Sequence, residues 1–324
     1  MFDLAGKSVF VAGHTGMVGR ALVRRLASEN VRMVGPASRI DYRRQADVEA
    51  WMEGERPQVL FLVAARVGGI FANDNAPAEF IYDNLMIGSN LIEAARRCGV
   101  EKLVYVGSSC IYPRESVQPI PESALLAGPL EPTNQWYAVA KIAGIKMTQA
   151  YRRQYGCDFI SVQPTNLYGP FDNFDLSASH VIPALMRKAH DAKLNRERQL
   201  VVWGSGHPKR EFMHVDDMAD ALVFLARTYS NDELVNIGSG QEVSIAELAH
   251  QIGEVVGLDA ELVFDSSKPD GTPRKLVDVS RLRSLGWDRA RPLDAGLAET
   301  YAWFREHLGD ARGYGGHSSS SSGD

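Results

Sequence analysis

The stretch Lys7-Ser8-Val9-Phe10-Val11-Ala12-Gly13-His14-Thr15-Gly16-Met17-Val18-Gly19 decides which fold this sequence predicts. Its first half is an apolar run typical of a buried strand, and residues 20–29 repeat apolar side chains at helical spacing. Between them, three glycines follow the spacing G-x-x-G-x-x-G. Glycine allows a tight turn and close approach of a pyrophosphate, and the following helix N-terminus offers amide donors. We therefore predict that residues 13–19 bind the phosphates of a dinucleotide.

The end of the next predicted strand, residues 31–35, indicates which dinucleotide binds. A carboxylate at this place binds the ribose 2′-hydroxyl of NAD, but the sequence continues Gly35-Pro36-Ala37-Ser38-Arg39 without one. Arginine suits a 2′-phosphate because it makes bidentate, charge-assisted hydrogen bonds. Arg39 therefore favours NADP(H) over NAD, and a solvated loop arginine is the alternative.

Strand and helix patterns alternate through the first half of the chain. The alternating segments are apolar runs at 59–65, 103–106 and 159–162 and helical patterns at 43–53, 84–98 and 137–155. This alternation predicts an α/β fold, a Rossmann-type doubly wound parallel sheet that binds its ligand at the carboxyl ends of the strands. We expect four residues at these ends to line one crevice: Gly13, Ala64, Ser108 and Pro164.

The alternation stops after Pro170, and we expect a smaller C-terminal α/β substrate domain over the crevice. The predicted NADP-binding domain comprises residues 1–170, and residues 215–240 are expected to rejoin its sheet. The predicted substrate domain comprises residues 171–214 and 241–312, and the Gly- and Ser-rich residues 313–324 are expected to be disordered.

Smaller features of the pattern predict loops and helix caps. Residues 66–75, rich in Gly and Asn, and the basic, turn-rich residues 268–275 are expected to be loops. Asp216 is expected to cap one helix, and Ser244 another, with Glu247 completing a capping box.

The composition is typical of a globular enzyme. The 324 residues are 45% hydrophobic and 23% charged with a net charge of −5, whereas nucleic-acid-binding proteins usually carry a basic excess. The longest apolar run, residues 59–65, is too short to span a membrane, and no leader pattern opens the sequence. Three cysteines without such a leader favour reduced thiols in the cytoplasm, and no Cys or His pair has zinc-site spacing, so we expect no metal.

A candidate reaction centre lies within residues 107–141. Gly107-Ser108-Ser109-Cys110-Ile111-Tyr112-Pro113 follows a predicted strand, and Tyr137 precedes Lys141 by four residues, which places both on one helix face. Because a nearby ammonium lowers the pKa of a phenol, we expect Tyr137 to exchange a proton with a carbonyl near neutral pH. The hydroxyls of Ser108 and Ser109 could bind the same oxygen, so this combination indicates carbonyl chemistry.

The glycine motif, Ser108 and Tyr137-x-x-x-Lys141 together resemble the extended short-chain dehydrogenase/reductase family. Further motifs resemble members that act on GDP-linked keto sugars; they are Ala65-Arg66-Val67-Gly68-Gly69-Ile70, Glu131-Pro132-Thr133-Asn134, Pro164-Thr165-Asn166-Leu167-Tyr168-Gly169-Pro170, Ser179-His180-Val181-Ile182-Pro183-Ala184-Leu185, Arg210-Glu211-Phe212-Met213-His214-Val215-Asp216-Asp217 and residues 267–275. The motifs are spread over nearly all of residues 7–308.

The resemblance implies a set of NADP(H) contacts and an assembly. The cofactor contacts are residues 13–19, Arg39, Ala64, Ala65, Tyr137, Lys141, Pro164, Thr165, Asn166, Leu167 and His180. Thr15 replaces a basic residue found in some relatives, and this removes one possible contact with a cofactor phosphate. The preference for NADP therefore depends more strongly on Arg39. A homodimer is implied, formed through helices at 84–98 and 137–155.

The activity that the resemblance implies is conversion of GDP-4-keto-6-deoxy-D-mannose to GDP-L-fucose by epimerisation at C3 and C5 and reduction at C4. Protons beside the C4 ketone are acidic, and Ser108, Tyr137 and Lys141 are implied to stabilise the enolate. Cys110 is implied as the base and His180 as the acid. An inert buried thiol and a capping histidine are the respective alternatives.

The resemblance also implies GDP contacts at Lys188, Trp203, Arg210 and Lys275. Cations suit a diphosphate, and an aromatic ring suits packing against a sugar or base. Lys188 stands where relatives often have arginine, and it keeps the charge without the bidentate fork. The alternative for Trp203 is a structural position in the core, because a tryptophan at a strand end is often buried.

Two other functions compete with this one. The first is an epimerase–reductase for a related dideoxy sugar, as in GDP-L-colitose formation, which would carry nearly the same motifs. The second is a non-catalytic protein that binds NADP(H) as a sensor or scaffold. Loss of Tyr137 or Lys141 would favour the second, and both residues are present.

Overall fold

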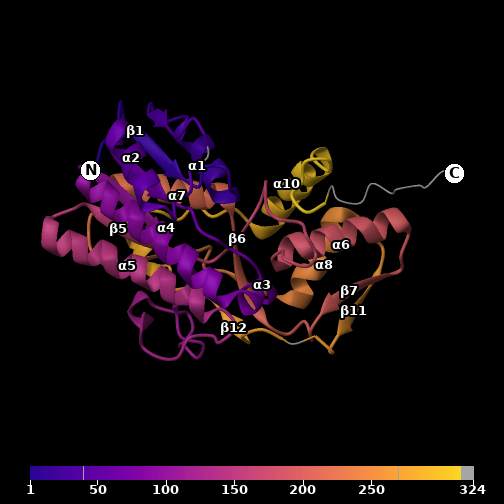
Figure 1. Ribbon diagram of the computed structural model, residues 1–324. Helices are drawn as coiled ribbons and strands as arrows, with labels where there is room; N and C mark the ends of the chain where they lie inside the picture. Colours follow the sequence, from indigo (N-terminus) through magenta and orange to yellow (C-terminus); the bar gives the residue numbers. More distant parts are fainter. Residues whose placement is uncertain (39, 269, 315–324) are drawn as a thin grey trace.

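The computed structural model describes residues 1–38, 40–268 and 270–314, without the side chains of Ile70 and Phe71. Arg39, which favours NADP(H) in the sequence, lies outside the described residues, as do residues 315–324 of the predicted tail. The described chain forms two α/β parts that lie side by side (Figure 1).

The larger part is built on a six-stranded sheet, in which each strand is parallel to its neighbours in the order β2-β1-β3-β4-β5-β9. Its strands are β1 (Ser8–Ala12), β2 (Arg32–Val34), β3 (Val59–Leu62), β4 (Lys102–Val106), β5 (Phe159–Pro164) and β9 (Val235–Ile237). The predicted Rossmann-type parallel sheet is confirmed. Strand β9 pairs with β5 although it comes from far along the chain.

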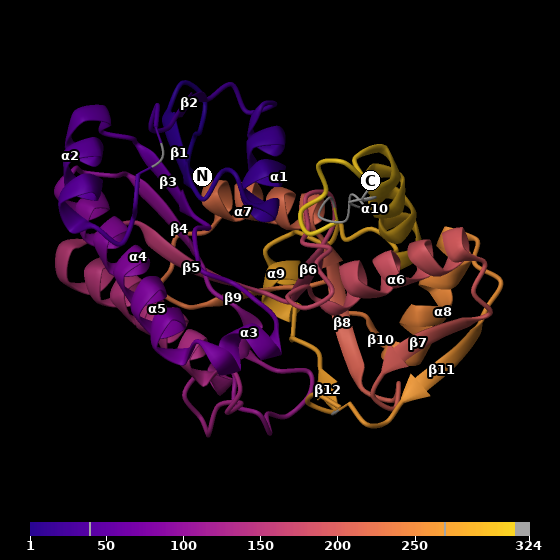
Figure 2. The same cartoon turned by 45° about the vertical axis from the view of Figure 1, so that its right-hand side comes forward.

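Helices cover both faces of this sheet, as Figure 2 shows. They are α1 (Met17–Leu26), α2 (Gln45–Glu55), α4 (Pro77–Arg97), α5 (Gln135–Tyr155) and α7 (Val215–Thr228). Successive side chains of a strand point to opposite faces, so Val9 and Val11 of β1 belong to the core under α1 and α7, and Phe10 belongs to the core under α2, α4 and α5. This two-sided burial explains why the strands are continuous apolar runs.

The smaller part has its own core and two small sheets. Strands β6 (Asn166–Tyr168), β8 (Lys209–His214), β10 (Glu242–Ser244) and β12 (Arg274–Lys275) form one sheet, and β7 (Gln199–Trp203) pairs with β11 (Glu261–Asp265) in the other. The helices around them are α6 (Val181–Asn195), α8 (Ile245–Val256) and α10 (Leu293–Glu306). The remaining short helices are α3 (Ile70–Asn75), α9 (Ser280–Ser284) and the 3-10 turns η1 (Ser109–Ile111) and η2 (Glu122–Ala124).

Several local predictions were wrong. The predicted loop at 66–75 contains α3, and α4 begins at Pro77 rather than at Asn84, because proline fits the first turn of a helix. The predicted loop at 268–275 ends in the short strand β12. This strand forms by pairing with β8, which is distant in the sequence, so the local pattern did not predict it.

The two predicted helix caps differ in outcome. His214, not Asp216, caps α7, because Nδ1 of His214 accepts a hydrogen bond from the Asp216 amide at 3.2 Å. The capping box of α8 is confirmed: the Glu247 amide donates to Ser244 Oγ at 3.1 Å, and the Ser244 amide donates to the Glu247 carboxylate at 2.9 Å.

The start of the predicted tail is attached to the smaller part. The hydroxyl of Tyr314 donates to Asp191 at 3.0 Å, and Arg187 donates to the carbonyl of Gly313 at 2.7 Å. For these two tail residues the prediction of disorder was wrong, because α6 holds them. Over the described part of the chain, no helix has the length and apolar character needed to cross a membrane.

Candidate active site

The glycine turn between β1 and α1 packs closely against itself and against the end of β3. Gly13 has φ +96°, and a Cβ there would lie 2.8 Å from the Ala64 amide nitrogen at the end of β3. A Cβ on Gly19 would lie 2.1 Å from the carbonyl oxygen of Gly13. No side chain caps α1 at Gly16, so its first amides can bind an anion. These features fit the pyrophosphate of a dinucleotide.

The other predicted cofactor residues at the strand ends differ in their exposure and in their hydrogen bonds. Ala64 is buried at the end of β3, whereas His14 and Thr15 are exposed on the glycine turn. The side chains of Thr165 and Asn166 both donate to the carbonyl of Glu211, at 3.3 and 2.9 Å. These side chains therefore attach β8 to the residues that follow β5, where the Thr165 amide also donates to the carbonyl of Ile237 at 2.9 Å.

Tyr137, Ser108 and Lys141 come together at the carboxyl end of β4. The hydroxyls of Tyr137 and Ser108 are hydrogen-bonded, and Ser108 caps η1 by accepting from the Cys110 amide at 3.4 Å. Lys141 lies one helical turn after Tyr137, with its ammonium 5.8 Å from the phenol ring centre and 2.8 Å from the carbonyl oxygen of Val106. The shared helix face inferred from their spacing thus places both at one strand end.

The pKa values in this cluster differ from the prediction that Lys141 lowers the pKa of Tyr137. Burial raises the pKa of Tyr137 well above its ordinary value, and a negative charge on Cys110 would raise it further. Burial also lowers the pKa of Lys141 to about 7. Desolvation penalises the charged form of both groups, which sequence spacing does not reveal. Tyr137 is therefore a proton donor at neutral pH.

Cys110 is half-buried in a pocket beside this cluster. Its sulfur receives hydrogen bonds from Asn134 Nδ2 at 3.5 Å and from Lys275 Nζ at 3.9 Å. The pocket is also lined by Arg114, Glu131 and Arg274. Lys275 was predicted to contact GDP, and the structure places it against the thiol. Asn134 was quoted only as part of a motif, and its contact with Cys110 depends on tertiary structure.

His180 precedes α6 and is exposed, yet the surrounding protein lowers its pKa by desolvation. The residues before it pack against the start of α3, where the Gly69 amide donates to the carbonyl of Ala178 at 3.4 Å. Within residues 1–38, 40–268 and 270–314, no hydrogen bond joins His180 to Ser108, Cys110 or Tyr137. A catalytic function for His180 therefore stays a prediction.

All four predicted GDP contacts lie on the smaller part. Trp203 is 54% exposed, so its alternative assignment to the core is wrong. The ammonium groups of Lys188 and Lys268 lie 4.6 and 5.3 Å from its ring centre. Lys268 was not predicted, although it stands in the basic stretch 268–275. Arg210, on β8, is opposite Lys275 of β12, and burial lowers its pKa.

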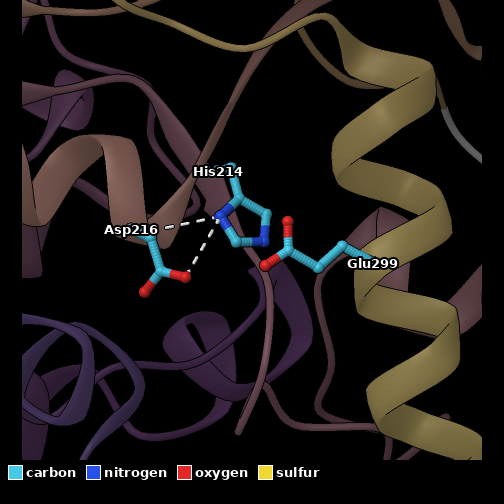
Figure 3. Close-up of side chains that lie close together, drawn as sticks. All are labelled: His214, Asp216 and Glu299. Atoms are coloured by element: carbon cyan, nitrogen blue, oxygen red, sulfur yellow. Dashed lines mark hydrogen bonds and ion pairs between the residues drawn. The ribbon is translucent and has the colours of Figure 1, made fainter. Parts of the chain in front are cut away.

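One group of possible metal ligands occurs among the described residues, formed by His214, Asp216 and Glu299 (Figure 3). Both carboxylates already have arginine partners: Asp216 pairs with Arg24 at 2.5 Å, and Glu299 pairs with Arg291. The buried His214 faces both carboxylates and caps α7. We interpret this group as a structural junction of β8, α7 and α10, because the arginines already neutralise its carboxylates.

Comparison with known proteins shows which enzymes this chain is similar to. A model of the NAD dependent epimerase/dehydratase family matches residues 9–238. The chain is 56% identical over 311 residues to the GDP-L-fucose synthase of Sinorhizobium fredii, covering 96% of this chain and 99% of that protein. The solved structure of a GDP-L-fucose synthetase from Naegleria fowleri bound to NADP matches with a TM-score of 0.88 and 30% identity, covering 95% of this chain and 97% of that one. The GDP-L-colitose synthase of Yersinia pseudotuberculosis is 33% identical, covering 91% of this chain and 97% of that protein.

Proposed function

The chain belongs to the NAD dependent epimerase/dehydratase family, and from that premise we propose that it is an enzyme that converts GDP-4-keto-6-deoxy-D-mannose to GDP-L-fucose. The observation that carries the proposal is the position of Cys110 next to the hydrogen-bonded pair Ser108 and Tyr137. The pair can polarise a carbonyl, and the thiol can remove a proton from the neighbouring carbon. A simple ketone reductase has no use for that second group.

The similarities to known enzymes support this substrate over its nearest alternative. The identity to a GDP-L-fucose synthase is 56%, against 33% to a GDP-L-colitose synthase. A non-catalytic scaffold has less support, because Ser108, Tyr137 and Lys141 are all in place.

NADP(H) is the proposed cofactor, held by residues 13–19, by the ends of β3 and β5 and by Arg39. The uncapped N-terminus of α1 and the two glycines that leave no room for a Cβ suit its pyrophosphate. When bound, it supplies the reducing equivalent for C4. The binding of NADP by a similar solved enzyme supports the choice of the phosphorylated dinucleotide.

Epimerisation uses the residues around the C4 oxygen and the two faces of the sugar ring. Tyr137 and Ser108 donate hydrogen bonds to that oxygen, which lets the electrons of a C3–H or C5–H bond move onto it as an enolate. Cys110 takes the proton, and His180 returns one to the opposite face of the same carbon. Because desolvation by the surrounding protein lowers the pKa of His180, its imidazolium, once formed, gives up a proton more readily than that of a free histidine.

Reduction uses Tyr137 again. Because burial raises the pKa of Tyr137, the phenol keeps its proton at neutral pH and can give it to the C4 oxygen as that atom becomes an alkoxide. The ammonium of Lys141 donates to the Val106 carbonyl and lies 5.8 Å from the ring centre of Tyr137. It is also proposed to contact the cofactor.

The substrate's GDP is proposed to bind across the smaller part. Trp203 offers an exposed aromatic face with Lys188 above it, and Arg210 on β8 adds a second cation. Two cations and one aromatic ring match a diphosphate and a base or sugar.

A homodimer is the proposed assembly, through α4 and α5, which lie against each other at the edge of the molecule (Figure 1). Their exposed apolar residues include Tyr82, Val139 and Tyr155. The three cysteines are free thiols, which fits the proposed reducing cytoplasm.

The proposal is tested with the purified protein, NADPH and GDP-4-keto-6-deoxy-D-mannose in deuterated water. We expect NADPH oxidation and GDP-L-fucose that carries deuterium at C3 and C5. No NADPH oxidation by the folded protein would defeat the proposal. In Cys110→Ser, we expect exchange at both carbons to be lost, whereas Cys157→Ser, a matched control at a cysteine away from the site, keeps it.

A further inference from the structure

The predicted GDP contact Lys275 has a different partner in the structure. Strand β12 pairs with β8, and this pairing places Lys275 opposite Arg210 and directs its ammonium to Cys110, where Nζ lies 3.9 Å from the sulfur. The sulfur also receives Asn134 Nδ2 at 3.5 Å. Two donors from different elements, a strand of the smaller part and the start of α5, thus meet at one sulfur atom.

The charges around the pocket leave Lys275 available to the sulfur. Arg274 is paired with Glu242 at 2.7 Å, and Arg114 with Glu131 at 3.5 Å. In the described part of the chain, Lys275 has no carboxylate partner within salt-bridge distance. Three cations and one carboxylate therefore line the pocket, and the cation closest to the sulfur is the one whose charge is not neutralised.

Asn134 is fixed in place by the helix that it begins. Its own amide donates to the carbonyl of Glu131 at 3.2 Å, and its carbonyl accepts from the Ala138 amide at 3.1 Å. The side chain therefore extends from a rigid position, and Nδ2 meets the sulfur without a change of backbone. A fixed neutral donor and a cation are the two kinds of group that stabilise a thiolate.

We propose that Lys275 and Asn134 stabilise the thiolate of Cys110 and thereby prepare it as the base, so that Lys275 is a positioning residue rather than a GDP contact. The inference rests on the proposed function. The thiolate takes the proton from C3 or C5, the C–H electron pair moves to the C4 oxygen, and His180 reprotonates the carbon. The Cys110 thiol then loses its proton to solvent, and His180 takes up a proton from solvent. The step therefore needs no oxidant or reductant.

The test measures the thiolate in the free protein, without substrate. Alkylation of Cys110 by iodoacetamide at pH 7.5 is followed by peptide mass spectrometry, which separates it from Cys98 and Cys157. We expect Lys275→Met to slow this reaction about 5- to 30-fold and Asn134→Ala to slow it about 2- to 3-fold, because only the thiolate reacts. Lys275→Arg keeps the charge and should restore most of the rate.

Lys209→Met is the matched control, because it removes an exposed lysine of β8 that lies outside the pocket lining. Its alkylation rate should equal that of the unaltered protein. Thermal melting of each variant shows whether the fold is intact, and Asn134→Ala, which also removes a donor from the sulfur, keeps the inference testable if Lys275→Met does not fold.

A second readout separates the two functions that Lys275 could have. If it supports the thiolate, Lys275→Met lowers the rate of deuterium exchange at C3 and C5 and changes the KM for the sugar less than 2-fold. An unchanged alkylation rate, with or without weaker GDP binding, would overturn the inference. If the unaltered protein catalyses no exchange while its alkylation still depends on Lys275, the proposed function fails and the thiolate site stands.

Discussion

Tyr137 shows how far a single residue can be understood from its neighbours in the chain. Its spacing from Lys141 indicated a shared helix face, and the structure places both at the end of β4. The state of the phenol depends instead on burial, which raises its pKa. Tyr137 is thus better described as a protonated donor than as a phenolate.

A first prediction at this scale concerns Tyr137→Phe. Removing the hydroxyl should lower the rate of NADPH oxidation at least about 100-fold, because the C4 alkoxide loses its proton donor. Deuterium exchange at C3 and C5 should fall less, since Ser108 still binds the C4 oxygen. Single-turnover NADPH oxidation and proton NMR of the exchanged sugar measure the two effects. Equal losses in both steps would contradict this division of labour.

A second prediction concerns the stability cost of Lys141. Its pKa is lowered to about 7 in the fold, so between that value and its unfolded pKa near 10.5 the unfolded chain binds more protons. The free energy of unfolding therefore rises with pH across this range. Lys141→Met should be about 1–3 kcal/mol more stable at pH 7, with the difference shrinking toward pH 10. Denaturant titrations at several pH values measure it, and a loss of stability at pH 7 would contradict the burial argument.

At the scale of elements, the turn from β1 to α1 depends on glycine for a steric reason. The space at Gly19 is closed by the carbonyl of Gly13, 2.1 Å from where a Cβ would lie. The sequence predicted the turn and its ligand, because strand, glycines and helix are contiguous. It did not predict β6 or β12, whose hydrogen bonds go to β8.

The corresponding prediction is that Gly19→Ala weakens NADPH binding about 100-fold or more, because the Cβ displaces the turn that faces the pyrophosphate. Gly54→Ala is the matched control, since this helical glycine has nothing within 4 Å of the added carbon. The control should keep its affinity and gain a little stability, as alanine favours a helix. Fluorescence titration with NADPH measures both, and equal affinities would remove Gly19 from the cofactor site.

At the scale of the whole molecule, the exposed face of α4 and α5 carries the proposed dimer contact. Val139 is 41% exposed and Tyr82 is 59% exposed. Val139→Asp should shift the protein toward a monomer, because a charge would be buried in the interface. Val117, which is 80% exposed in the loop between η1 and η2, provides the control Val117→Asp. Light scattering after size exclusion gives the masses, and an unaltered protein that is monomeric at micromolar concentration would refute the dimer.

Sequence patterns alone predicted the parallel sheet, the glycine turn and the grouping of Ser108 with Tyr137 and Lys141. Each of these follows from residues close together in the chain or from strand ends that a parallel sheet must place at one edge. The groups around Cys110 and the burial of Tyr137 and Lys141 depend on contacts between distant segments, which the sequence patterns do not show. Lys275 reaches the sulfur because β12 pairs with β8, and such a pairing between segments distant in the chain leaves no pattern in the local sequence. Desolvation likewise depends on everything that packs around a side chain, which is why the fold of this protein could be predicted further than the protonation of its site.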